Sequence, residues 1–307
     1  MVEDFFFDDH DSDLSRSLHF MTTLLTVNDM RRHAHDVLTT GQTIGFVPTM
    51  GALHDGHAGL IRRAAQEHPH VVVSIFVNPT QFGPGEDFDR YPRTFEHDVT
   101  LATEAGATAI FAPSVTEMYP PQASTTVSVG GVTDVLEGAS RPGHFDGVAT
   151  IVSKLFLATQ ATQAYFGQKD LQQTLVVRQL VRDLLFPITI TVVPTVREAD
   201  GLAMSSRNVY LSTEDRAAAP VLYRALREVE RLVLEAAVPP SPLNLESALR
   251  AIISQEERAH IDYAVVVDAD TLRRPDVLSP GDSLAAVVAV RFGSTRLLDN
   301  HLFTVPS

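Results

Sequence analysis

The stretch TIGFVPTMGALHDGHAGLIRRAA, residues 43–65, decides the fold because it joins two patterns that alternate along the chain. It begins with a short apolar run of the kind buried in parallel sheets, and it ends with the spacing of an amphipathic helix. Two glycines and two histidines, Gly51, Gly56, His54 and His57, lie at the junction. A packed core would favour leucines there, so the junction is a candidate site for chemistry.

The same alternation continues through the first two thirds of the chain. Further β-rich runs lie at residues 71–77, 109–114, 164–167 and 188–196, and helical runs lie at 57–68, 95–106, 146–159 and 170–185. Repetition of this kind predicts an α/β fold, a doubly wound parallel sheet with helices on both faces. Ligands bind such sheets beyond the carboxyl ends of the strands, which is where functional residues are expected.

The pattern changes after Arg207. One long helix is expected at residues 212–237 and another at 244–258, followed by strands at 260–272, 284–293 and 294–303. Helices followed by clustered strands predict a second, smaller α+β domain. We therefore expect a first domain at residues 21–195 and a C-terminal domain at residues 196–307.

The composition limits the classes of function. The 307 residues carry a formal charge of −14, which disfavours nucleic-acid binding because that depends on clustered Lys and Arg. Without cysteine there is no disulfide, thiolate metal site or thiol nucleophile. No apolar stretch approaches the roughly 20 residues that span a bilayer, and the N-terminus lacks a secretion-signal pattern. We expect a cytoplasmic protein that acts on small molecules, with neither nucleic-acid nor membrane partners.

The first 20 residues differ from the rest of the chain. They carry six acidic side chains against one arginine, which predicts a disordered extension. The run Phe5–Phe7 is unusual for a disordered segment. The alternative is that the start codon is misplaced and that Met21 is the true first residue.

The junction after the first strand suits a phosphate group. His54 and His57 share one face of the first helical turn, where backbone N–H groups lack partners and the helix dipole is positive. Gly51 allows a close backbone approach, and Gly56 keeps the space between the two imidazoles open. The alternative interpretation is an ordinary helix start with two exposed histidines.

A second polar stretch, VNPTQFGPGEDFDRYPR, follows the next strand at residues 77–93. Its Asn78 and Gln81 side chains form hydrogen bonds without carrying charge, which suits a substrate with hydroxyl and carboxylate groups. The alternative is a turn in which these amides cap the local backbone.

A third stretch, FGQKDLQQ, occupies residues 166–173. Gly167 ends a strand, Asp170 can begin a helix, and Gln173 lies roughly one turn further on. Lys169 would project into the same crevice, where its charge could stabilise phosphoryl oxygens during transfer. A surface lysine beside a helix cap is the alternative.

Two further loops contain candidate residues. Ser205, Ser206 and Arg207 form a compact set of hydroxyl and guanidinium donors in a loop between the two predicted domains. A loop of this kind can close over a triphosphate, although Ser-Ser-Arg is also common in ordinary loops. His144, in RPGHFDGVATIV at residues 141–152, could be functional, but a structural turn is the favoured interpretation.

Taken together, these stretches resemble the pantothenate synthetase (pantoate–β-alanine ligase) family. The resemblance runs from about Leu24 to the C-terminus. It rests on the order and spacing of PTMGALHDGH, SIFVNPTQFGPGEDFDRYPRT, RPGHFDGV, YFGQKDLQQ, VPTVREADGLAMSSRN and TRLLDN. The chain contains neither GxxxxGK[ST] nor GxGxxG, but a nucleotide could still be held by the HxGH helix start, Lys169 and the Ser-Ser-Arg loop.

The resemblance implies a homodimer with a Rossmann-like first domain and a C-terminal domain that forms a lid. It also implies an enzyme, an AMP-forming ligase of pantothenate biosynthesis that uses ATP with Mg²⁺. Pantoate would attack the α-phosphorus of ATP, pyrophosphate would leave, and β-alanine would then attack the pantoyl adenylate to give pantothenate and AMP. No covalent enzyme intermediate is required.

The resemblance also implies roles for individual residues. The ATP-contacting residues would be Met50, Gly51, His54, His57, Gly167, Lys169, Asp170, Val196, Met204, Ser205, Ser206 and Arg207. The catalytic residues among them would be His54, His57, Lys169, Ser205, Ser206 and Arg207, with His57 as the family's proton donor. Gln81 and Gln173 would hold pantoate, and Gln81 would also lie near β-alanine.

The sequence departs from the family in a region linked to Mg²⁺. Glu96, His97 and Asp98 stand where some members are more uniformly acidic, so the protein ligands of the metal stay unassigned. Two other functions remain open: a nucleotidyltransferase that joins AMP to a phosphorylated substrate, and a nucleotide-binding regulator without turnover. The regulator is disfavoured because four residues suited to catalysis are intact: His54, His57, Lys169 and Arg207.

Overall fold

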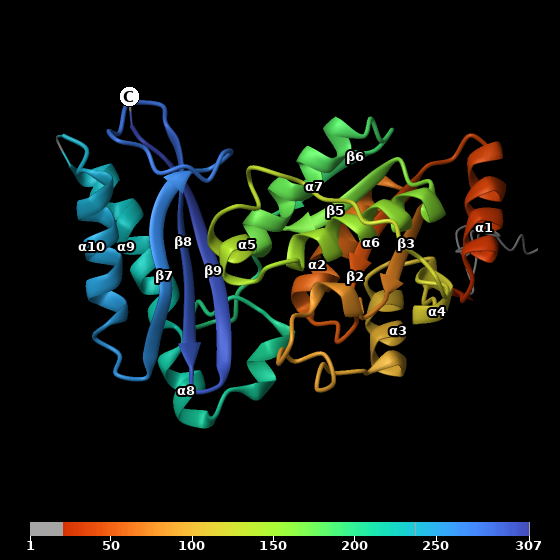
Figure 1. Cartoon of the computed structure of the whole chain (residues 1–307), viewed down its shortest axis with the longest axis horizontal. Coiled ribbons are helices and arrows are strands. Elements are labelled where there is room, and N and C mark those ends of the chain that lie inside the picture. Colours follow the sequence, from red (N-terminus) through yellow and green to blue (C-terminus); the bar gives the residue numbers. More distant parts are fainter. Residues whose placement is uncertain (1–20, 237, 307) are drawn as a thin grey trace, which may run out of the picture.

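The computed structural model describes residues 21–236 and 238–306; the predicted extension, residues 1–20, lies outside this part. Within it, six parallel strands form one sheet and three antiparallel strands form another (Figure 1). The parallel strands are β1 (Thr22–Leu24), β2 (Ile44–Thr49), β3 (His70–Ile75), β4 (Ala109–Phe111), β5 (Gln163–Gly167) and β6 (Thr189–Val193). The antiparallel strands are β7 (Ala259–Asp268), β8 (Ser283–Phe292) and β9 (Thr295–Thr304).

The helices of the described residues connect and cover these strands. The α-helices are α1 (Val27–Thr39), α2 (Asp55–Glu67), α3 (Phe95–Glu104), α4 (Val115–Met118), α5 (Leu136–Ser140), α6 (His144–Thr159), α7 (Leu171–Asp183), α8 (Thr213–Ala218), α9 (Val221–Glu235) and α10 (Pro242–Ile253). The 3₁₀ turns are η1 (Pro79–Gln81), η2 (Gln168–Asp170) and η3 (Ser206–Tyr210). The predicted class, a doubly wound Rossmann-like sheet with a smaller C-terminal α+β part, is confirmed.

The strand order β1-β4-β3-β2-β5-β6 creates a switch point in the parallel sheet. The chain moves outward from β2 through β3 to β4 and then returns to pair β5 with the other side of β2. A crevice therefore opens at the carboxyl ends of β2 and β5, because their connections run in opposite directions.

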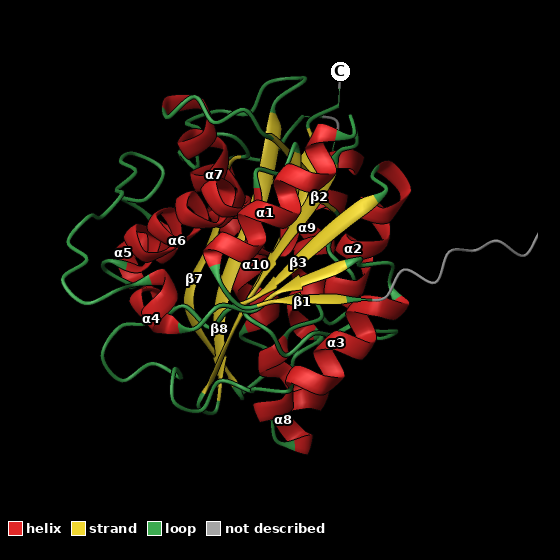
Figure 2. Cartoon of the chain, turned by 90° about the vertical axis from the view of Figure 1, so that its right-hand side faces the viewer, coloured by secondary structure: helices red, strands yellow, loops and turns green. Residues whose placement is uncertain are grey.

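The alternation of side chains in the central strands explains why both faces of the parallel sheet are covered. Phe46 and Val72 face the layer built from α1 and α6, whereas Val47 and Val73 face α2 and α3. All four side chains are fully buried. Successive strand residues point to opposite faces, so a nearly continuous apolar run is required. Figure 2 shows α6 and α2 on opposite sides of the sheet.

The antiparallel sheet packs between two sets of helices. On one face α9 and α10 contribute buried residues at helical spacing, including Leu222, Leu226 and Val229 of α9. On the other face, Leu171 and Leu175 of α7 pack against residues of β7 and β8. The second sheet thus lies beside the carboxyl edge of the first (Figure 1).

Two features differ from the sequence expectations. The single helix expected at residues 212–237 is wrong: Pro220 separates α8 from α9, because proline removes a backbone donor and its ring blocks continuation of the helix. The strand β1 and helix α1 were not expected. Only Met30, Ala34 and Val37 of α1 are buried, so its apolar stripe is narrow.

We predict that Gly147→Ala destabilises the protein although alanine is the better helix former by about 1 kcal/mol. A Cβ atom at Gly147 of α6 would lie 2.4 Å from the carbonyl oxygen of Thr80 and 2.7 Å from the Cα atom of Gln81. Relieving this overlap moves backbone, so we expect a net loss of about 1–3 kcal/mol in the free energy of unfolding, measured by denaturant titration.

Gly130→Ala is the matched control for this substitution. A Cβ atom at Gly130, in an exposed loop, would meet no atom within 4 Å. Its unfolding free energy should stay near that of the unmodified protein. Equal stability of the two variants would show that α6 and the turn at Thr80 are not in close backbone contact.

Candidate active site

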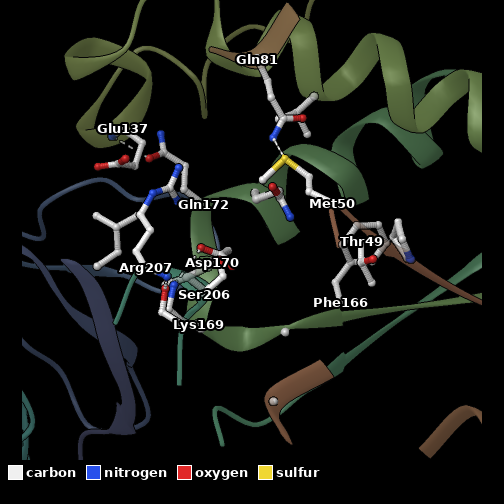
Figure 3. A pocket seen from close by; sticks show the side chains of 18 of the residues that line it. Thr49, Met50, Gln81, Glu137, Phe166, Lys169, Asp170, Gln172, Ser206 and Arg207 are labelled. Carbon is white, nitrogen blue, oxygen red and sulfur yellow. Dashed lines mark hydrogen bonds and ion pairs between the residues drawn. The ribbon is translucent and has the colours of Figure 1, made fainter. Parts of the chain in front are cut away.

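A pocket of about 260 Å³ lies at the switch point between β2 and β5 and extends to β9 (Figure 3). It brings together nearly all residues that the sequence singled out. The lining includes Met50, His54, His57, Gln81, Gly167, Lys169, Asp170, Gln173, Val196, Met204, Ser205, Ser206 and Arg207. Gly51 is not part of this lining. The roles assigned to these residues stay predictions.

The two histidines form the first turn of α2. His54 is the N-cap, and its Nδ1 atom accepts a hydrogen bond from the backbone N–H of Gly56 at 3.1 Å. The Nδ1 atom of His57 accepts one from the N–H of His54 at 3.3 Å. The ring centroids are 4.1 Å apart, and a Cβ atom at Gly56 would lie 2.7 Å from the His54 ring. Glycine is therefore required beside His54.

Both imidazoles are neutral near pH 7. Burial, together with the nearby Lys169 ammonium, lowers the pKa of His54 to about 4. Burial, His54 and Lys169 lower the pKa of His57 well below its usual range. Because each Nδ1 atom accepts from a backbone N–H, the single proton of each neutral ring resides on Nε2. The pair therefore offers two uncharged N–H donors.

Gly51 lies in the turn between β2 and α2 and does not line the pocket. Its φ is +83°, a conformation that favours glycine, and a Cβ atom there would lie 3.0 Å from Asp98 Oδ2. The Asp98 carboxylate is buried and accepts hydrogen bonds from Ala52 N and Leu53 N at 2.9 and 2.8 Å, and from Thr94 Oγ1 at 2.9 Å. Asp98 thus fixes the turn that leads to the histidines.

The hydrogen bonds of Asp98 limit its ability to bind Mg²⁺. Its two oxygens are occupied by backbone and hydroxyl donors, while Glu96 and His97 are exposed on α3. No group of three or more His, Asp or Glu side chains in residues 21–236 and 238–306 could hold a metal ion. These residues do not fit a protein-built Mg²⁺ site, in keeping with the usual binding of Mg²⁺ through substrate phosphates.

Lys169 reaches the pocket from η2, directly after β5. Its Nζ atom lies 3.5 Å from Asp170 Oδ1. The carbonyl oxygens of Gln168 and Lys169 both accept hydrogen bonds from Asn300 Nδ2 of β9, each at 2.9 Å. The antiparallel sheet therefore holds the backbone that carries the lysine.

The Ser-Ser-Arg segment contacts the loop that follows β3. Arg207 forms a two-pronged ion pair with Asp87 at 2.8 and 3.0 Å. Ser206 Oγ lies 3.2 Å from the hydroxyl of Tyr91, and Ser205 Oγ accepts from Arg207 N at 3.3 Å. Arg207 is thus already paired with a carboxylate, an arrangement that the sequence did not indicate.

Three glutamine side chains line the pocket: Gln81, Gln172 and Gln173. Gln81 lines the pocket, with Asn78 Nδ2 donating to its Oε1 at 3.0 Å and the ring of His144 contacting its carbonyl oxygen at 2.8 Å. Gln173 also lines the pocket. Its neighbour Gln172 also lines the pocket, and its amide binds the backbone of the 132–137 segment.

Ion-paired residues on the far side of the pocket were not predicted from the sequence. Arg296 of β9 forms an ion pair with the buried Glu137 of α5 at 2.6 Å, and Tyr263 of β7 donates to the same carboxylate at 2.9 Å. Arg141 binds Glu86 at 2.6 Å. Arg296 and Arg141 lie within the quoted stretches TRLLDN and RPGHFDGV, which was the available signal.

Sequence comparisons relate the chain to one family of enzymes. The sequence model of the family described as pantoate-beta-alanine ligase matches residues 22–302. The pantothenate synthetase of Chloroflexus aurantiacus is 53% identical over 284 residues, which cover 92% of this chain and 98% of that protein. The pantothenate synthetase of Acetivibrio thermocellus is 50% identical over 285 residues, covering 93% and 100%.

Solved structures give the same result. The crystal structure of pantothenate synthetase from Thermus thermophilus has a TM-score of 0.86 and 48% identity, covering 94% of this chain and 100% of that one. The pantoate-beta-alanine ligase from Francisella tularensis, solved with beta-gamma ATP and beta-alanine, has a TM-score of 0.75 and 32% identity, covering 92% and 97%. The resemblance found in the sequence is confirmed: the chain is an enzyme, and it belongs to the pantoate–β-alanine ligase family.

Proposed function

We propose that the chain condenses pantoate with β-alanine to form pantothenate, uses ATP, and passes through a bound pantoyl adenylate. The observation that carries the proposal is the convergence of His54, His57 and Lys169 with Gln81 and Gln173 in one pocket. The first three can bind phosphate oxygens, and the two amides can bind a hydroxy acid. The Francisella tularensis relative was solved in complex with beta-gamma ATP and beta-alanine, which supports the proposal.

In the first step a pantoate carboxylate oxygen attacks the α-phosphorus of ATP and pyrophosphate leaves. Negative charge then grows on the oxygens around the α-phosphorus and on the leaving group. The Nε2–H groups of His54 and His57 and the Lys169 ammonium are the donors for that charge, assisted by the positive end of the α2 helix dipole. The neutral rings act as hydrogen-bond donors rather than as general acids.

In the second step the free amine of β-alanine attacks the acyl carbon, the bond to AMP breaks, and the amine loses a proton. No protein nucleophile takes part in either step. Gln81, which borders the acyl end of the pocket in this proposal, contacts both pantoate and β-alanine. Mg²⁺, if bound together with the nucleotide, would supply additional positive charge for its phosphates.

The proposed function also includes an oligomeric state, a location and a lid. We propose a homodimeric, cytoplasmic enzyme in which residues 196–307 form the lid domain and Ser205–Arg207 close over the phosphates. In support, Ser206 and Arg207 already contact the loop at Asp87 and Tyr91. The described part of the chain contains no helix with the length and apolar content needed to cross a bilayer.

ATP–pyrophosphate exchange tests the proposed function. Purified protein with Mg²⁺ should catalyse exchange only when pantoate is present, and addition of β-alanine should yield free AMP and pantothenate. A folded protein without pantoate-dependent exchange would contradict the proposal. Formation of a dinucleotide with a phosphorylated acceptor would instead identify a nucleotidyltransferase.

Lys169→Met should lower the exchange rate on the order of 10²-fold or more, because it removes one aimed cation while keeping the length of the side chain. The comparison variant is Arg178→Met, which removes one positive charge from the exposed face of α7. Its exchange rate should stay within about twofold of the unmodified enzyme. Similar rates for both variants would remove Lys169 from the transition state.

Proton uptake on ATP binding tests the histidine pair. The pKa of His54 is about 4 in the free site, and phosphate oxygens stabilise the imidazolium, so binding raises this pKa. In the pH range from about 4 up to the raised pKa of His54 in the complex, the bound protein then carries more protons than the free protein. We expect proton uptake, and an ATP affinity that rises as the pH falls through this window.

Calorimetry in buffers of different ionisation enthalpy measures this uptake directly. His54→Gln should take up fewer protons, whereas His97→Gln, an exposed residue of α3 outside the pocket, should match the unmodified protein. Protonation of ATP itself contributes equally to all three. Equal uptake by the His54 variant and the unmodified protein would mean that His54 does not contact the phosphates.

A further inference from the structure

A chain of contacting side chains, partly buried at its outer end and buried at its inner end, lies outside the proposed chemistry and ends at Gln81. It runs from Lys154 of α6 to Tyr119 after α4, then to Asn78 after β3, and from there to Gln81 in η1. Asn78 is 1% exposed and Gln81 is 9% exposed. Polar groups buried to this extent are costly unless they are hydrogen-bonded, so the chain fixes particular orientations.

The orientation of the Asn78 amide follows from its neighbours. Its Nδ2 atom lies 3.1 Å from the carbonyl oxygen of Gly147, which can only accept a hydrogen bond. On the other side, Oδ1 lies 2.8 Å from the hydroxyl of Tyr119 and 3.0 Å from the hydroxyl of Thr80. A flipped amide would oppose oxygen to the Gly147 carbonyl, so one orientation is strongly favoured.

The Asn78 orientation in turn sets that of Gln81. The second proton of Asn78 Nδ2 is donated over 3.0 Å, so the Gln81 atom that receives it must be the oxygen Oε1. The Gln81 Nε2 group then points to the pocket, where it lies 3.1 Å from the Sδ atom of Met50. A thioether is a weak acceptor, which leaves this NH₂ group available to a stronger one.

Tyr119 holds the outer end of the chain. Burial raises the pKa of its phenol, so the hydroxyl stays protonated and can donate. The Lys154 ammonium lies 4.3 Å from the centre of the Tyr119 ring and donates to the Met118 carbonyl at 2.5 Å. Gly147 and Lys154 are two turns apart on α6, so one rigid helix supports both the phenol and the Asn78 amide.

We propose that Tyr119 is a positioning residue for the hydroxy-acid substrate: through Asn78 it holds Gln81 with its NH₂ group toward the pocket. The inference rests on the proposed function, in which Gln81 contacts pantoate. It deepens that function by assigning the polarity of the contact. Toward the pocket Gln81 offers only N–H donors, because its oxygen already accepts from Asn78. This part of the pocket therefore selects a substrate oxygen that accepts a hydrogen bond, such as that of a carboxylate or of a hydroxyl group with a free lone pair.

Tyr119→Phe should weaken this selection without removing the fold or the nucleotide site. Thr80 still donates to Asn78 Oδ1, so the amide chain is loosened rather than broken. We expect the KM for pantoate to rise roughly tenfold, as for loss of one buried hydrogen bond, with kcat and the KM for ATP within about twofold. The control is Tyr223→Phe on α9, outside the pocket lining, which should leave all three constants unchanged.

A double-mutant cycle separates positioning from general damage. Gln81→Met removes the amide, so adding Tyr119→Phe to that variant should produce no further rise in the KM for pantoate. Independent multiplication of the two effects would overturn the proposal. An unchanged KM for pantoate in Tyr119→Phe alone would overturn it as well.

A readout that needs no substrate completes the test. In ¹⁵N-labelled protein the side-chain amide signal of Gln81, identified by its loss in Gln81→Met, should shift or split in Tyr119→Phe and stay unchanged in Tyr223→Phe. An unchanged Gln81 signal in Tyr119→Phe would refute the positioning role. If the unmodified protein shows no pantoate-dependent exchange, the proposed function fails by itself, and the amide signal still decides the orientation.

Discussion

The site depends on one constraint, the parallel pairing of β2 with both β3 and β5. The register aligns Gly45 of β2 with Gln163 of β5, so Thr49 and Gly167 end their strands at the same edge of the sheet. The histidine turn leaves β2 at that edge and the Lys169 turn leaves β5. Two segments separated by more than one hundred residues of sequence therefore meet because two buried strands pair.

Burial controls the charge of the pocket that results. It holds His54 and His57 neutral, so the imidazoles bring donors without bringing cations. The Arg207 guanidinium is matched by Asp87, which leaves the Lys169 ammonium, loosely associated with Asp170, as the cation nearest to the histidine turn. A polyanionic ligand would bind a polar surface that donates hydrogen bonds but carries little net positive charge. Such a surface favours reversible binding of a nucleotide, because dissociation then breaks few strong ion pairs.

The sequence predicted much of this arrangement because its signals were local: apolar runs revealed β2, β3 and β5, and the polar residues after each run marked the rim of the sheet. The sequence did not predict β1 and α1, because their local signals are weak: β1 has three residues, and α1 buries only a narrow apolar stripe. Arg207 was identified, but its partner Asp87 lies 120 residues away and no local pattern joins them. Gln172 and Gln173 are adjacent and chemically identical, and both border the pocket, but no local pattern indicates that the Gln172 amide binds the backbone of the 132–137 segment.

The antiparallel sheet is more than a cover for the pocket. Asn300 binds the two carbonyl groups next to Lys169, and Arg296 binds the carboxylate of Glu137, so β9 supports the pocket from two sides. The Ser206 segment is held in a comparable way, because Arg207 forms a two-pronged ion pair with Asp87 and Ser206 contacts the hydroxyl of the buried Tyr91. Opening of the pocket at either place therefore breaks a two-pronged ion pair, and at β9 it also removes the Asn300 donor from two backbone carbonyls.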